Sequence, residues 1–179
     1  MNHILNGKRI VLRTPTINDV HSIYTYAREP EISRYTTLPQ PYLLSHAKKF
    51  IKDTALVHRK QQAYHFAIIW KESGKLIGMI GLEHYDKTAK KAELGYWLGK
   101  PYWGQKIMQE AMRLVLQFGF KTLRLQRIYA RTMHPNIAST HLLLKHGFKH
   151  EGILRRHIFR NNEWLDQNDF GLLKEEHHR

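Results

Sequence analysis

The sequence contains no cysteine among its 179 residues. It therefore has no disulfide, no thiolate metal ligand and no cysteine nucleophile. No apolar run approaches the roughly 18 uncharged residues that a membrane span requires, and the N-terminal stretch MNHILNGKR lacks the apolar segment of a secretion signal. These absences predict a cytoplasmic protein with no membrane segment.

Acidic residues are scarce in one third of the chain. Between Lys100 and Arg160 there are twelve lysines and arginines but only two acids, Glu110 and Glu151, and the formal net charge of the whole chain is +14. Such a basic segment attracts nucleic acid, acidic protein surfaces or a phosphorylated cofactor. A generally basic, solvated surface explains the charge equally well. No zinc finger or aromatic RNA-binding signature supports a nucleic-acid-binding module.

The length and the apolar content of 42% predict one domain over residues 1–179 with a sizeable core. Apolar periodicity predicts helices at about 19–27, 42–58, 104–120 and 136–146. Strands are expected at 9–13, 64–70, 76–85, 92–98, 127–133, 148–159 and 164–173. This order predicts an α+β fold, in which helices flank a mixed sheet.

Two strand–turn–helix units carry the most chemical information. In the first unit, the strand expected at 92–98 is followed by Gly99 and Pro101, and an amphipathic helix begins almost at once. The first amides of a helix have no internal partner, so this turn is suited to an anionic ligand. The second unit begins at His134, and Gly147 is placed to end its helix. Two such units in one small domain indicate a bound cofactor.

A series of collinear motifs covers almost the whole chain: RIVLR (9–13), IGMIG (77–81), ELGYWL (93–98), WGQKIMQEA (103–111), NIAS (136–139), GF (147–148) and NEW (162–164). In these motifs the chain resembles the GNAT N-acetyltransferases, and specifically the RimJ/RimL-like branch that acetylates ribosomal-protein N-termini and various small amines. The resemblance implies a mixed, mostly antiparallel sheet whose central parallel strands splay apart.

The resemblance also implies that acetyl-CoA lies where these two strands diverge. Main-chain groups near Trp97 and Leu98 would hold the pantetheine arm and polarise the thioester carbonyl. The pyrophosphate would contact the turn and helix start, which comprise Trp103, Gly104, Gln105, Lys106, Ile107 and Met108.

Lys106 departs from the family pattern, which has glycine at this place. Glycine lets the main chain approach the phosphates closely, and a side chain could obstruct that approach. Alternatively, the Lys106 ammonium turns outward and pairs with a phosphate. A lost site would make the chain a non-catalytic GNAT-fold sensor or binding protein.

Asn136 and Ser139 open the second helix and lie one helical turn apart. The resemblance implies that Asn136 contacts the pantetheine amide and that Ser139 protonates the departing CoA thiolate. The alternatives are a plain helix cap and a first-turn serine bonded to backbone. The tyrosine that acts as the acid in other GNAT branches has no counterpart, because its place falls near Leu143.

Glu93 is the candidate general base, since it stands among apolar residues on the strand bordering the cleft. Period-two alternation places Glu93, Gly95 and Trp97 on one face of that strand. The alternative is an outward-facing strand carboxylate that pairs with a lysine. Only a neutral amine can attack the thioester, and deprotonation at pH 7 costs about 1 kcal/mol for an α-amine but about 4–5 kcal/mol for lysine.

The acceptor is expected to be a primary amine, either a protein N-terminus, ribosomal for example, or a small molecule. Residues 20–45 and 155–165 should shape its site; they carry Tyr24, Tyr35, Tyr42, Arg155, Arg156 and His157. The thirteen histidines form no closed ligand set, so no metal is expected. A homodimer is compatible with the sequence but does not follow from it.

Overall fold

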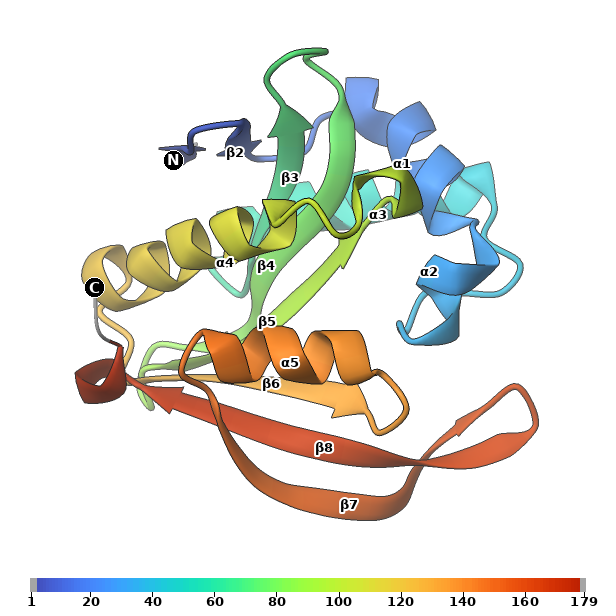
Figure 1. Ribbon diagram of the computed structural model, residues 1–179. Coiled ribbons are helices and arrows are strands. Elements are labelled where there is room, and N and C mark those ends of the chain that lie inside the picture. The colour runs from blue at the N-terminus through green and yellow to red at the C-terminus, as the bar shows by residue number, and fades with distance from the viewer. Residues whose placement is uncertain (1–2, 178–179) are drawn as a thin grey trace.

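An eight-stranded sheet forms the centre of the protein, in the order β1-β2-β3-β4-β5-β6-β8-β7 (Figure 1). The computed structural model describes residues 3–177. Every neighbouring pair of strands is antiparallel except β5 and β6, which are parallel. The strands are β1 (Ile4–Asn6), β2 (Ile10–Arg13), β3 (Tyr64–Trp70), β4 (Leu76–Asp86), β5 (Lys91–Leu98), β6 (Arg127–Met133), β7 (Lys149–Arg160) and β8 (Glu163–Leu173).

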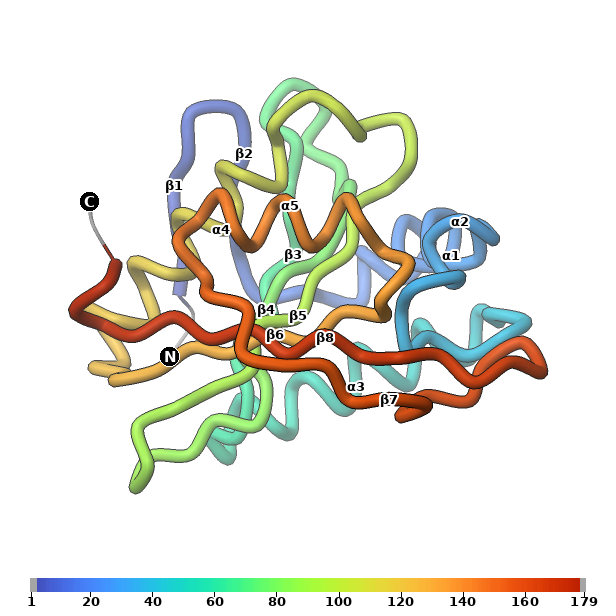
Figure 2. The backbone as a smooth tube through the Cα atoms, turned by 60° about the horizontal axis from the view of Figure 1, so that its bottom comes forward, coloured from blue at the N-terminus to red at the C-terminus, as the bar shows by residue number. Residues whose placement is uncertain are grey.

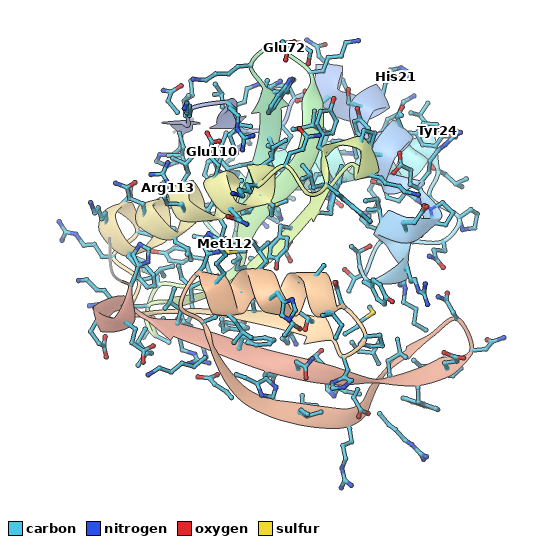
Figure 3. The ribbon with its side chains drawn as sticks, in the orientation of Figure 1. His21, Tyr24, Glu72, Glu110, Met112 and Arg113 are labelled. Atoms are coloured by element: carbon cyan, nitrogen blue, oxygen red, sulfur yellow. The ribbon has the colours of Figure 1, made fainter. Side chains whose placement is uncertain are left out.

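Helices cover both faces of this sheet, which confirms the α+β architecture (Figure 1). Helices α4 and α5 lie on one face and α3 on the other, and Met112 points from α4 toward α5 (Figure 3). No helix within residues 3–177 is long and apolar enough to cross a membrane. The α-helices are α1 (Val20–Ala27), α2 (Pro30–Arg34), α3 (Leu44–Arg59), α4 (Ile107–Gln117) and α5 (Ile137–Lys145). Short 3₁₀ turns occupy Ile17–Asp19, Lys100–Tyr102 and Lys174–Glu176, and Phe118–Thr122 forms a π-helical turn.

The element boundaries differ from expectation mainly around α4. The helix begins at Ile107 rather than 104, because Gly104 (φ +73°) and Lys106 (φ 60°) adopt left-handed backbone conformations that interrupt helical geometry. Strand β1 and the short helix α2 were not anticipated. Gly147 adopts φ +85° just after α5 and ends that helix as expected.

The parallel strands β5 and β6 pair over only three residues each. Lys91–Glu93 face Arg127–Tyr129, and no pairing follows among the later residues that the structure describes. The edge of β5 from 94 to 98 that faces β6 therefore has no strand partner. This is the splayed pair that the family resemblance implies.

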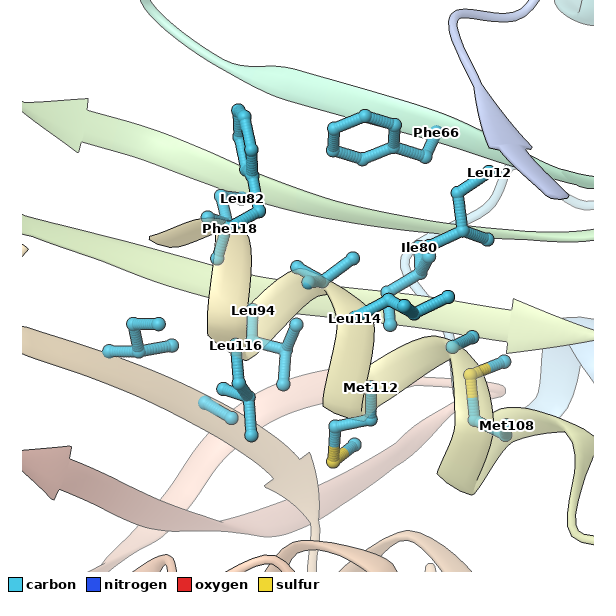
Figure 4. Packing of buried hydrophobic residues seen from close by; sticks show 14 of the residues in the cluster. Leu12, Phe66, Ile80, Leu82, Leu94, Met108, Met112, Leu114, Leu116 and Phe118 are labelled. Carbon is cyan, nitrogen blue, oxygen red and sulfur yellow. The ribbon is translucent and has the colours of Figure 1, made fainter. Parts of the chain in front are cut away.

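Two apolar clusters hold these layers together. The larger one lies between the sheet and α4, where buried α4 residues pack on strand residues such as Phe66 and Leu82 (Figure 4). The smaller one includes Ile23 of α1, Ile51 of α3 and Met79 of β4 on the opposite face. Burial of apolar surface at about 25 cal/mol per Å² makes these clusters the main source of stability. The sheet between them fixes where β5 and β6 diverge.

The β7–β8 hairpin extends away from the sheet toward the loop after α2 (Figure 2). The guanidinium of Arg160 donates hydrogen bonds to the main-chain oxygens of Ser33 (2.6 Å) and Leu38 (2.9 Å). One hydrogen-bonded side chain thus joins the hairpin to residues 33–38. The turn residues Asn161 and Asn162 both have positive φ, as a two-residue hairpin turn requires.

Candidate active site

A cavity of about 470 Å³ opens where β5 and β6 separate. Its volume is within the range of small-molecule sites. Its wall combines β5 with the start of α4, the first residues of α5 and residues of α2 and the following loop. The aliphatic lining residues, with Met108, are Ile32, Leu94, Leu98, Ile107, Ala130, Ala138, Leu142 and Leu143.

The start of α4 presents unpaired main-chain donors to this cavity. The first intrahelical hydrogen bond runs from the Glu110 N–H to the Lys106 carbonyl (3.3 Å). The amides of Ile107, Met108 and Gln109 precede it and have no acceptor within the helix, and all three residues line the cavity. Together with the helix dipole, these amides make an anion-binding site.

Glu110, in the first turn of α4 (Figure 3), joins this end of the helix to the turn between β1 and β2. Its carboxylate accepts hydrogen bonds from the Arg9 main-chain N–H (2.9 Å) and side chain (3.3 Å). Burial opposes ionisation, but the bonds from Arg9 and Lys8 outweigh it and lower the pKa of Glu110. A carboxylate in the first turn also complements the helix dipole. The orientation of the free amides is thereby fixed.

Lys106 adopts the left-handed backbone conformation that favours glycine. Its φ of 60° and ψ of 16° are left-handed, so the main chain follows the course expected for glycine. The side chain is exposed and lines the cavity. Gln105 hydrogen-bonds back to the Pro101 carbonyl at 2.9 Å, and Trp103 donates its indole N–H to the Leu98 carbonyl at 2.6 Å. These contacts brace the turn without the side chain of Lys106.

The second predicted unit contributes Asn136 and Ser139, which also line the cavity. The Asn136 side chain caps α5 by accepting a hydrogen bond from the Ser139 N–H at 3.2 Å. Its amide NH₂ group remains available to a ligand. The Ser139 hydroxyl lies 2.6 Å from the phenolic oxygen of Tyr96 on β5.

Tyr96 also lines the cavity. Burial raises its pKa to about 12, against the opposing effect of the Ser139 hydrogen bond. The phenol therefore stays protonated at physiological pH. Nothing in the local sequence signals this contact, because the two residues are 43 positions apart and meet only through the arrangement of β5 and α5.

Glu93 is not among the lining residues of the cavity. Its carboxylate makes a two-point ion pair with Arg131, with Nε donating at 2.8 Å, and lies 3.8 Å from His84 Nε2. Arg131 does line the cavity. The alternation on β5 is as expected, since Leu94 and Tyr96 pack toward α4 whereas Trp97 packs with the opposite cluster.

Most of the remaining predicted cofactor residues lie around the same cavity. Trp97, Leu98, Trp103, Gly104, Ile107 and Met108 line the cavity, whereas Gln105 does not. On the acceptor side Tyr35 lines it, but Tyr42 is buried in the smaller cluster, and Tyr24 contacts Arg28 instead. Ile32 and Thr36, which lie in the predicted segment 20–45 but were not singled out there, also line it. No group of histidines and acids within residues 3–177 could hold a metal ion.

Four of the twelve basic residues between Lys100 and Arg160 form ion pairs. Arg127 pairs with Glu151, Arg131 with Glu93, and Lys100 and Lys149 with Glu31 and Glu176. Arg160 is committed to main-chain carbonyls. Lys106 and Lys145 line the cavity.

A model of the acetyltransferase (GNAT) domain matches residues 9–149. The chain belongs to the GNAT acetyltransferase family. It is 32% identical over 173 residues to "Uncharacterized N-acetyltransferase p20" of Bacillus licheniformis, covering 97% of each chain. It is 30% identical over 121 residues to the ribosomal-protein-serine acetyltransferase of Escherichia coli, covering 68% of this chain and 66% of the relative.

The fold is also found in a solved acetyltransferase structure. The spermidine N-acetyltransferase of Vibrio cholerae, in complex with CoA and spermine, superimposes with a TM-score of 0.84 over 94% of this chain and 98% of that chain, at 20% identity. This GNAT enzyme is thus an acetyltransferase with RimJ/RimL-like relatives, and its family uses acetyl-CoA.

Proposed function

We propose that this GNAT acetyltransferase transfers the acetyl group of acetyl-CoA to the α-amine of a polypeptide. The observation that carries the proposal is the cavity at the β5–β6 divergence, with the unpaired amides of Ile107, Met108 and Gln109 at one end and the Ser139 hydroxyl in its wall. The coenzyme is a substrate here, and the residues present fit its chemistry.

The charged end of the coenzyme matches the start of α4. Unpaired amides and the Lys106 ammonium would bind the diphosphate, and Lys145 offers a second cation. The unpaired edge of β5 would bind the pantetheine arm as an added strand does. The free NH₂ of Asn136 supplies one more donor on the facing wall.

In the proposed reaction the acceptor nitrogen bonds to the acetyl carbon while the carbon–sulfur bond breaks. The amine passes a proton to a water molecule, and the departing sulfur takes a proton from Ser139, which regains one from water. An α-amine with a pKa of about 7.7–8.0 needs little help to lose its proton. Glu93 lies outside the cavity and is hydrogen-bonded to Arg131, which lines it. We infer that Glu93 acts as a base through water and contributes less to the rate than Ser139.

The lining charges favour a peptide over a polyamine. Of the described residues that line the cavity, only Glu31 is acidic, and it is paired with Lys100. A polycation would find no other carboxylate there, whereas a polypeptide N-terminus carries one modest positive charge. The ribosomal-protein acetyltransferase among the relatives agrees with this choice.

The test is thiol release from acetyl-CoA with a panel of free N-terminal peptides, N-acetylated peptides containing lysine, and spermidine. We expect turnover with free N-termini to exceed that with the other amines at least tenfold. Ser139→Ala should lower kcat by about 100-fold, as loss of an acid does, with acetyl-CoA affinity changed less than twofold. Ser73→Ala, in the β3–β4 turn, is the matched control. Preference for spermidine, or an unimpaired Ser139→Ala, would overturn the proposal.

A further inference from the structure

The hydroxyl groups of Tyr96 and Ser139 form a close pair inside the cavity. Their oxygens are 2.6 Å apart, and each residue comes from a separate wall, Tyr96 from β5 and Ser139 from α5. Both residues line the cavity, and both are partly buried. The contact thus joins the two elements between which the coenzyme would lie.

The chemistry of the two groups decides which one donates. A phenol is more acidic than an aliphatic alcohol, and its oxygen is a poorer acceptor because one lone pair is delocalised into the ring. The arrangement in which Tyr96 donates and Ser139 accepts is therefore preferred. It leaves the Ser139 proton directed elsewhere, and the backbone of Ser139 is already held by the Asn136 cap.

From this geometry we propose that Tyr96 is a positioning residue that directs the Ser139 proton toward the departing sulfur. The inference rests on the proposed function, in which Ser139 is the acid. As the sulfur takes that proton, negative charge develops on the Ser139 oxygen, and the Tyr96 O–H is already aimed at it. Such a preorganised donor stabilises developing charge without reorganisation.

Tyr96 keeps its own proton throughout. Because burial raises the pKa of this phenol to about 12, it remains neutral across the pH range of an assay. The proton that Ser139 gives is replaced from solvent, so no net transfer through Tyr96 is needed. The role therefore predicts a loss of rate with no change in the shape of the pH profile.

Tyr96→Phe retains the ring and removes only the hydroxyl. We expect kcat to fall about tenfold, as loss of one hydrogen bond of ordinary strength does, with the KM for acetyl-CoA changed less than twofold. In a Ser139→Ala background the same substitution should have no further effect. Tyr85→Phe, on the neighbouring strand and outside the cavity, is the matched control, and melting temperatures verify that both variants fold.

Three results would overturn this inference. The first is full activity of Tyr96→Phe, and the second is a double variant whose kcat is lower than that of Ser139→Ala alone. The third is a raised KM for acetyl-CoA at unchanged kcat in Tyr96→Phe, which would show that Tyr96 only lines the cavity. If the wild type is active, Ser139→Ala is impaired and Tyr96→Phe is not, this inference alone is refuted. A wild type that releases no thiol with any amine refutes the proposed function as well.

Discussion

Lys106→Gly gives the sharpest test of how the coenzyme turn works. Lys106 replaces the glycine of the family pattern, yet its backbone already has the left-handed conformation of a glycine, and its side chain is exposed at the cavity. The side chain therefore does not fill the site. We expect it to bind a phosphate, so that its removal weakens acetyl-CoA binding.

We expect Lys106→Gly to change the affinity for acetyl-CoA more than the stability of the fold. A partly exposed ammonium–phosphate contact contributes about 1 kcal/mol, equivalent to about fivefold in Kd. The substitution also relieves about 1 kcal/mol of left-handed strain but adds about 0.4–1 kcal/mol of unfolded-state entropy. These stability effects nearly cancel, so the melting temperature should change by less than about 3 °C.

Calorimetric titration of wild type, Lys106→Gly and Lys106→Asn with acetyl-CoA measures the affinity directly. Asparagine tolerates the left-handed conformation without carrying charge, so it separates charge from backbone effects. Both variants should bind about fivefold more weakly at low salt, and the difference should shrink in 0.5 M salt. A large tightening in Lys106→Gly would show that lysine obstructs the site and would refute this reasoning.

Two other substitutions test the surrounding structure. Arg160→Met removes the hydrogen bonds to the Ser33 and Leu38 carbonyls and should loosen residues 33–38, which include two residues of the cavity lining. We expect the KM for the acceptor to rise about tenfold while the Kd for acetyl-CoA stays constant. Equal rises in both constants would contradict this expectation. Asp19→Ala leaves Arg13 partly buried without its two-point partner and should lower stability by about 3 kcal/mol in thermal denaturation at pH 7. Burial opposes ionisation of Asp19, but bonds from Arg13 and Thr16 outweigh it and depress its pKa, so this contribution is present above the unfolded pKa near 3.9 and is lost as pH falls through the folded value. A stability difference that stays constant as the pH falls below about 3.9 would contradict this linkage.

The elements with strong periodicity could be predicted from the sequence. The alternation in 92–98 and the apolar stripe of α4 identified both central elements, and the glycine at 147 marked the end of α5. Strand β1 has only three residues and no periodicity to detect. The start of α4 was misplaced by three residues, because a lysine gives no sequence signal for a left-handed conformation.

The site was predictable where its residues are neighbours along the chain. The amides of the α4 turn and the Asn136–Ser139 unit are local motifs. The Tyr96–Ser139 contact, the Glu93–Arg131 pair and the Arg160 contacts join residues 43, 38 and more than 120 positions apart, respectively. Such pairs depend on strand order and register, which single-residue patterns do not encode.

The proposed function depends on the first amides of α4 binding the diphosphate of the coenzyme. The most direct measurement is a residue-resolved NMR titration with acetyl-CoA that follows the amide resonances and hydrogen exchange of Ile107, Met108 and Gln109. We expect these resonances to shift on binding and their exchange to slow, together with that of residues 94–98. Binding that leaves all three amides unchanged, or no binding at millimolar coenzyme, would contradict it.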